Sequence, residues 1–274
     1  MVQAIWRSFG CFLTAALLMT AALAGAEPAS AGQGPLRPVV LGVPLHVGGL
    51  VGGVVQALAH PQHNRAPRPD FVPTCEANWR SAKCTRLALA AIKHALAAEG
   101  VRHWKLVLPR DYRSLTVGEQ TFVIIDLERV ARGLKPFAGL TGPFNTASHT
   151  AAVTRVDPNP AISTLRALGV SEFGSNWAGD FGPLASDYDW MYNDGYGSGG
   201  INMACLSPQA AGCWGHRDNI VGTYRHLPTL LAGAGTGRPA GRSIATVMSG
   251  GGGSPPKLTY TWRQAKRHGA RAHA

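Results

Sequence analysis

The chain has 274 residues, with 26 Lys and Arg against 15 Asp and Glu, so its formal net charge is +11. This length allows one domain with a sizeable core and flanking tails, and the basic balance favours acidic polymers, phosphate-rich surfaces or anionic lipid head groups as partners. The sequence contains no recognised nucleic-acid-binding module, so nucleic acid is not an expected partner.

The N-terminal segment has the three parts of a secretory signal peptide. Arg7 provides the positive charge, residues 12–23 form an apolar run, and Ala-Gly-Ala at 24–26 fits the small-x-small cleavage rule. The apolar run is shorter than the about 20 residues that a membrane span needs, and no later stretch is a candidate span. We therefore predict that residues 1–26 are removed and that the protein is secreted to the extracellular space. The alternative is an uncleaved N-terminal anchor.

A low-complexity extension is expected to follow the signal peptide. Residues 27–74 are rich in Pro, Gly and Ala and carry few charges before Arg65, which predicts poor order. Within it, residues 45–59 are rich in Val, Leu and Gly and form either a loose strand or a linker.

Residues 75–250 are expected to be the folded body, because apolar residues recur there at helical spacing. We predict helices over 84–98, 117–134 and 143–152, further helical turns at 161–168 and 183–192, and strands at 243–248 and 258–262. Helices that come first, strands that come later and many long loops predict an α+β fold of the layered type.

The last segment, residues 251–274, is predicted to contain a Gly-rich joint, a last strand and a basic tail. We expect the tail to be solvated and disordered. Its positive charges are Arg263, Lys266, Arg267 and Arg271.

Four cysteines remain after the predicted cleavage, since Cys11 lies in the signal peptide. An even count in an exported chain predicts disulfides, and we choose the two local pairs. The rival interpretation is a zinc site, but eight and seven intervening residues differ from the tight Cys-x-x-Cys spacing of zinc knuckles. The expected bonds are Cys75–Cys84 and Cys205–Cys213.

The region 171–221 is densest in residues that could carry chemistry. Trp, Asp, Gly and His gathered in a loop-rich stretch are typical of a binding cleft, although aromatic residues in long loops also simply pack beneath them. The candidate cleft residues are Ser175, Asp180, Trp190, Asp194, Trp214 and His216.

Several short sequence motifs, taken in their order along the chain, resemble the CAP superfamily of secreted proteins, also called SCP-like. The resemblance is to a divergent bacterial branch of the actinobacterial type. Residues 215–221 read Gly-His-Arg-Asp-Asn-Ile-Val, residues 126–129 read Asp-Leu-Glu-Arg, and residues 133–136 read Gly-Leu-Lys-Pro. The resemblance covers roughly residues 115–250. It implies a CAP-like α-β-α sandwich with long loops, flanked here by disordered termini.

The resemblance also implies a cavity with two His and two acidic residues, and this sequence departs from that pattern. His216 matches one His and Asp194 could match one acid, but no His lies near 157–160, and Ser175 stands where the family has Glu. A single imidazole with one carboxylate is a poor zinc site, so we expect neither a metal nor a cofactor. His216 is then either an acid or base in a cleft or a structural residue that fixes its loop.

These observations predict a secreted CAP-like extracellular protein that binds a ligand or associates with the cell surface or wall through a degenerate cavity. The ligand would be a lipid, a glycan or an anionic cell-envelope polymer. The alternative is an extracellular hydrolase that uses His216 with Asp194 or Asp180. A third interpretation is a structural envelope protein whose basic tail holds anionic wall polymers.

Overall fold

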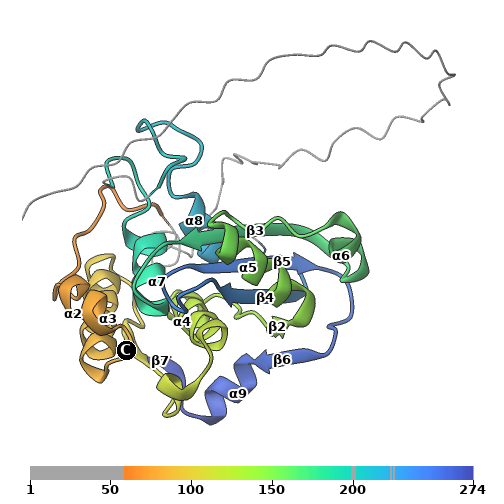
Figure 1. Ribbon diagram of the computed structural model, residues 1–274, viewed down its shortest axis with the longest axis horizontal. Helices are drawn as coiled ribbons and strands as arrows, with labels where there is room; N and C mark the ends of the chain where they lie inside the picture. Colours follow the sequence, from red (N-terminus) through yellow and green to blue (C-terminus); the bar gives the residue numbers. More distant parts are fainter. Residues whose placement is uncertain (1–58, 199–201, 223, 225, 274) are drawn as a thin grey trace, which may run out of the picture. The chain divides into compact units, whose positions relative to one another are not determined.

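The computed structural model describes residues 59–198, 202–222, 224 and 226–273. The predicted signal peptide and the extension up to residue 58 lie outside these residues. The described chain combines helices with open sheets, which confirms the predicted α+β class (Figure 1). Within the described ranges, no helix has the length and apolar character needed to cross a membrane.

The helices and helical turns are α2 (Val72–Asn78), α3 (Ala82–Ala98), η1 (Tyr112–Ser114), α4 (Val117–Ala131), α5 (Gly142–Thr154), α6 (Ile162–Ala167), α7 (Pro183–Tyr192), α8 (Gly215–Arg217), η2 (Asp218–Gly222) and α9 (Trp262–Arg267). The strands are β1 (Lys105–Val107), β2 (Gly139–Thr141), β3 (Val170–Ala178), β4 (Thr229–Thr236), β5 (Ile244–Gly251), β6 (Leu258–Thr261) and β7 (Arg271–His273). The predicted helical segments thus correspond to α3 to α7, and the two predicted strands correspond to β5 and β6.

The main sheet has five strands in the order β3-β5-β4-β2-β6. Strand β2 pairs with β4 in parallel at Leu140 and Ala232, and the other neighbours are antiparallel. Helix α5 packs on one face of β4, where Gly233 meets Phe144 of that helix. Helix α4 packs on the other face, where Ala234 meets Gly118, since successive residues of a strand point to opposite faces. The sheet is therefore covered by helices on both faces (Figure 1).

The central strand β4 is built from small residues because α5 lies directly on it. A Cβ atom at Gly233 would collide with Phe144, and one at Gly235 would collide with the backbone of His149. Glycine is needed at these two positions for the close approach of helix and strand.

Helix α4 is the centre of the main core. Its N-terminus is fixed by a capping box, in which Thr116 and Glu119 each bond the other's backbone N–H. The helix is buried on nearly every side, since it lies between β4 and the helix α7. Even Glu128 and the C-cap residue Arg132 are buried, so they require partners inside the core.

Both predicted disulfides are present. Cys75–Cys84 joins α2 to α3, and Cys205–Cys213 closes the loop that precedes α8. Two disulfides fit an extracellular protein.

The prediction of a disordered basic tail is wrong. Residues 262–273 form α9 and β7, and β7 pairs with β1 so that Lys105 lies opposite His273. Trp262 and Ala265 bury the inner side of α9, and this apolar anchoring explains why the segment is folded despite its charge.

The predicted extension also ends earlier than expected. Residues 59–74 are not a loose segment, because the backbone N–H of Arg65 donates to the carbonyl of Tyr192 at 2.8 Å and Phe71 is 2% exposed. The folded body therefore begins before Cys75. Sequence composition gave no indication of these contacts, since they are made with residues far along the chain.

Candidate functional site

Asp194 is the hub of the loop that follows α7. Its carboxylate is buried and accepts four hydrogen bonds. Oδ1 accepts from Asn202 Nδ2 and from His216 Nδ1, both at 2.7 Å, and Oδ2 accepts from the backbone N–H groups of His216 at 2.9 Å and Arg217 at 3.4 Å. A carboxylate with this many donors holds the start of α8 in one position.

The loop around Asp194 is closed by several local constraints. Asn202 Nδ2 also donates to the carbonyls of Asp194 at 2.8 Å and Gly212 at 2.9 Å. The N–H of Trp214 donates to the carbonyl of Asp194 at 3.0 Å, and Trp214 itself has a positive φ of 62°. Together with the Cys205–Cys213 disulfide, these bonds set the position of the next residues, 215–217.

The ring of His216 lies between two carboxylates. Besides Nδ1 at Asp194, its Nε2 lies 3.5 Å from Asp157 Oδ1, and the His216 side chain is 18% exposed. Burial lowers the pKa of His216, but hydrogen bonds to Asp157 and Asp194, together with their charges, outweigh burial and raise the pKa to about 9. We call Asp157, Asp194 and His216 the His216 cluster.

This arrangement limits the chemistry of the ring. At neutral pH an imidazole with a pKa of about 9 is a cation, and both of its N–H groups face carboxylates. A protonated ring has no lone pair with which to take a proton or bind a metal. Within the described ranges, no group of three or more His, Cys, Asp or Glu side chains is placed to hold a metal ion.

Asp157 is a member of the cluster that sequence reasoning missed. It follows α5, in the segment where the family resemblance would place a second His. The sequence indicates only that the His is absent there. The fold shows that an acid in this segment faces His216 Nε2.

Strand β3 is hydrogen-bonded to the backbone of the His216 cluster. Asn176 is fully buried, and its Nδ2 donates to the carbonyl of His216 at 3.0 Å. Asn219 Nδ2 donates to Asn176 Oδ1 and to the carbonyl of Ser175, each at 3.0 Å. A Cβ atom at Gly174 would collide with Asn219, so the strand and η2 are in close contact. The strings Gly-Ser-Asn at 174–176 and His-Arg-Asp-Asn at 216–219 are thus neighbours.

Arg217 anchors α8 in a buried ionic network. Its guanidinium donates to both carboxylate oxygens of Glu99, at 3.1 and 3.0 Å, and to the carbonyl of Met191 at 2.5 Å. Glu99 also binds Arg132 at 2.7 Å, and Arg132 in turn binds Glu128. A buried arginine fork of this kind fixes orientation as well as charge.

Residues 59–65 lie against the residues that flank the cluster in the sequence, which no local sequence pattern indicated. Asn64 donates from Nδ2 to the carbonyls of Gly195 and Tyr196, and its Oδ1 accepts from the N–H of Gly195 at 2.8 Å. His60 Nε2 lies 2.8 Å from Asp218 Oδ1, and its ring stacks on Trp214 with centroids 6.2 Å apart. We call residues 59–65 the N-terminal strap.

The remaining candidate residues have other roles. Trp190 is 2% exposed, and its Nε1 donates to the carbonyl of Trp177 at 3.1 Å, so it packs in the core. Asp180 hydrogen-bonds Asp189, and burial raises the pKa of both carboxyl groups. A hydrogen bond between two carboxyl groups requires a proton on one of them. Among the described residues, no contact joins Asp180 to His216.

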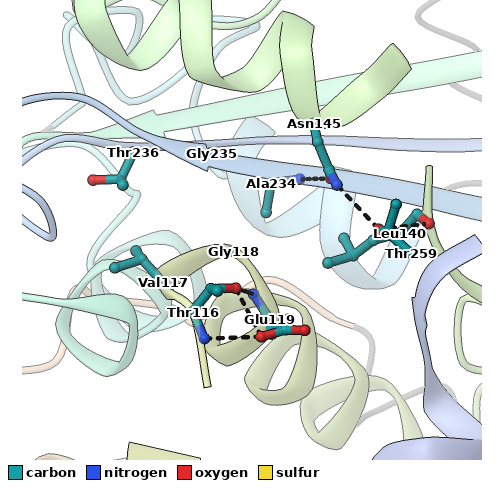
Figure 2. A pocket seen from close by; sticks show the side chains of 10 residues that line it. All are labelled: Thr116, Val117, Gly118, Glu119, Leu140, Asn145, Ala234, Gly235, Thr236 and Thr259. Carbon is teal, nitrogen blue, oxygen red and sulfur yellow. Dashed lines mark hydrogen bonds between the residues drawn. The ribbon is translucent and has the colours of Figure 1, made fainter. Parts of the chain in front are cut away.

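A pocket of about 350 Å³ lies elsewhere, between the N-terminus of α4, β4 and α5 (Figure 2). None of the candidate cleft residues lines it. Asn145 spans it, with Oδ1 accepting from the N–H of Ala234 at 3.1 Å and Nδ2 donating to Thr259 Oγ1 at 3.2 Å. The lining residues are Thr116, Val117, Gly118, Glu119, Leu140, Asn145, Ala234, Gly235, Thr236 and Thr259.

Comparison of the sequence with models of known protein families finds no match, and comparison with curated proteins finds none either.

Proposed function

We propose that the chain is a secreted, CAP-like extracellular binding domain in which the His216 cluster has a structural role and no catalytic one. Its cavity is degenerate, and its ligand is a component of the cell surface or cell wall. The observation that carries the proposal is the environment of His216, whose ring nitrogens both face carboxylates.

Two further observations support the CAP-like part of the proposal. The segment 174–176, where Ser175 takes the place of the family's Glu, is held to the string at 215–221 by the hydrogen bonds of Asn176 and Asn219. The sheet with helices on both faces agrees with the layered architecture that the resemblance implies. The two disulfides support export.

The test is the titration and removal of His216. By NMR, the imidazole of His216 is expected to titrate near pH 9 in the folded protein. Because its folded pKa is raised above the ordinary value of 6.5, its contribution to stability is fully present below about pH 6.5 and is lost as the pH rises through about 9. His216→Ala is therefore expected to lower the free energy of unfolding by about 1–3 kcal/mol at pH 6 and by less at pH 10.

His226→Ala is the matched control, because His226 is an exposed His on the surface and its loss should leave the melting temperature unchanged. Added zinc at micromolar concentration is expected not to raise the melting temperature of the wild type. Stabilisation by zinc, or a His216→Ala variant that melts like the wild type at pH 6, would contradict the structural role.

One observation favours the alternative, an extracellular hydrolase. The 2.7 Å bond between His216 Nδ1 and buried Asp194 is the geometry that orients an imidazole in catalysis. This alternative expects turnover of a p-nitrophenyl ester or of casein that His216→Ala abolishes without changing the melting temperature. The structural role expects no turnover of either by the wild type.

A further inference from the structure

The positive charge of the chain is concentrated at one end of the folded body. The segments 102–113 and 262–273 contain eight Lys and Arg against one acid, an excess of seven in a chain whose total excess is +11. All eight side chains belong to exposed residues. We call them the basic face, and they are Arg102, Lys105, Arg110, Arg113, Arg263, Lys266, Arg267 and Arg271.

The fold brings these two distant segments together. In the two-stranded sheet of β1 and β7, which we call the ribbon, Val107 lies opposite Arg271. The buried side chain of Leu106 shows which face of the ribbon points toward the protein core. Lys105 and Arg271 therefore lie on its outward side. The N–H of Arg110 donates to the carbonyl of His268 at 2.9 Å, which joins the loop after β1 to the end of α9.

Helix α9 continues the same surface. Trp262 and Ala265 form its buried side, so that Arg263, Lys266 and Arg267 face the solvent. The basic face thus comprises residues of α9, of the sheet formed by β1 and β7, of the turns before and after β1, and of η1.

The charges of the basic face are not compensated. The single acid of the two segments, Asp111, is engaged by His268 at 2.6 Å. Within the part of the chain that the structure describes, none of the eight side chains forms an ion pair with a carboxylate. Eight like charges on two neighbouring segments repel one another and attract a polyanion.

We propose that the basic face binds a linear polymer that carries phosphate groups along its length. Six of the eight residues are arginine, whose planar fork matches phosphate oxygens with two hydrogen bonds. A membrane surface is a poorer fit, because Trp104 is the one large apolar side chain exposed in these described segments and membrane-bound helices insert several.

This site is separate from the His216 cluster. Figure 1 shows α9 and β7 at the lower end of the folded body, away from α8 at its upper side. Binding to the basic face therefore does not depend on the role proposed for His216.

The experiment measures binding of the full chain to inorganic polyphosphate by calorimetry at about 150 mM salt. The triple variant Lys266→Gln, Arg267→Gln, Arg271→Gln is expected to bind at least about tenfold more weakly than the wild type. The matched control is Lys83→Gln, Arg86→Gln, Arg166→Gln, which removes the same charge from exposed residues of α3 and α6. The control is expected to retain the wild-type affinity within about twofold. Melting curves verify that both variants are folded.

Four results would overturn the proposal. The first is no binding of polyphosphate at this salt concentration. The second is an equal loss of affinity in both variants, which would indicate net charge alone. The third is equal binding of polyglutamate, which would remove the preference for phosphate. The fourth is tighter binding of phosphatidylglycerol vesicles or duplex DNA than of polyphosphate, which would assign the face to a membrane or to nucleic acid.

Discussion

At the scale of single residues, Asp187 stands out because it is buried without a hydrogen-bond partner. It lies on α7, it is fully buried, and neither of its carboxylate oxygens has a partner among the described residues. Burial raises its pKa well above the ordinary value, and the charge of Glu128 raises it further, while Arg132 acts in the opposite direction. Burial and the charge of Glu128 therefore favour the protonated, neutral form of the carboxyl group in the folded protein.

This predicts a pH-dependent effect of Asp187→Asn. In the unfolded chain Asp187 ionises near pH 4, whereas in the folded chain its pKa is raised, so the wild type loses stability as the pH rises above about 4. Asn does not titrate, and the variant should therefore gain about 1–3 kcal/mol relative to the wild type between pH 4 and pH 7. Urea unfolding at both pH values measures this.

Glu76→Gln is the control for Asp187→Asn, because Glu76 is exposed and its loss should leave the pH profile unchanged. An Asp187→Asn variant that is equally destabilised at both pH values would instead mean that the carboxylate is charged and paired in the folded state.

The residue scale also shows what the sequence could predict of the candidate site. His216 and Asp194 were identified from their motifs, and the structure joins them at 2.7 Å. Asp157 and Asn64 were not, because their roles depend on contacts with residues far along the chain. Asp180 was assigned to the cleft by its position in the sequence, but its partner is Asp189. Proximity along the chain is a poor guide within a loop-rich region.

At the scale of elements, the helices were the most predictable part. Helix α4 has an apolar repeat and a capping box, and both are local signals. Strand β4 was missed because its interior, Leu-Leu-Ala-Gly-Ala-Gly, lacks the β-branched and aromatic residues typical of strands. Its glycines serve the contact with α5, which is a property of tertiary packing. Strand β7 was missed because its partner, β1, lies far away in the sequence.

The loop that holds Asp194 gives a prediction at the same scale. Replacing Cys205 and Cys213 together with Ser removes a short closed loop, and the entropy of the unfolded chain rises. The free energy of unfolding should fall by about 2–3 kcal/mol, as measured by guanidinium denaturation.

The loosened loop should also weaken the bond between Asp194 and His216, so the pKa of His216 should fall below about 9. The matched variant is the pair Cys75→Ser and Cys84→Ser, which removes the other disulfide and should leave the pKa of His216 unchanged. Unaltered titration of His216 in both variants would show that the disulfide does not position Asp194.

At the scale of the whole molecule, the N-terminal strap extends the folded body to residues before α2. Asn64 forms three hydrogen bonds to Gly195 and Tyr196, and the carbonyl of Ala59 accepts from Arg217 at 3.3 Å. The strap therefore connects the part of the chain before α2 to the loop of the His216 cluster.

This connection predicts the effect of trimming. A chain that begins at residue 66 should melt at a lower temperature than one that begins at residue 59, and the difference should correspond to about 1–3 kcal/mol for the polar groups left unpaired in the loop. Calorimetry of the two chains measures the difference. Asn64→Ala in the longer chain should reproduce part of the loss, and equal melting of the two trimmed chains would mean that the strap only rests on the surface.

The pairing of β1 with β7 also sets the timing of folding. Lys105 pairs with His273, and β6 covers the edge of β2 from residues 258–261, so both sheets are completed by strands that lie after residue 257. Contacts between such distant residues form late, because the intervening loop must first be closed. During synthesis the N-terminal helices emerge before β7, so β1 lacks its partner strand until residues 271–273 have been made. A product that ends before residue 258 leaves β2 as an open edge, which is a template for aggregation with other chains.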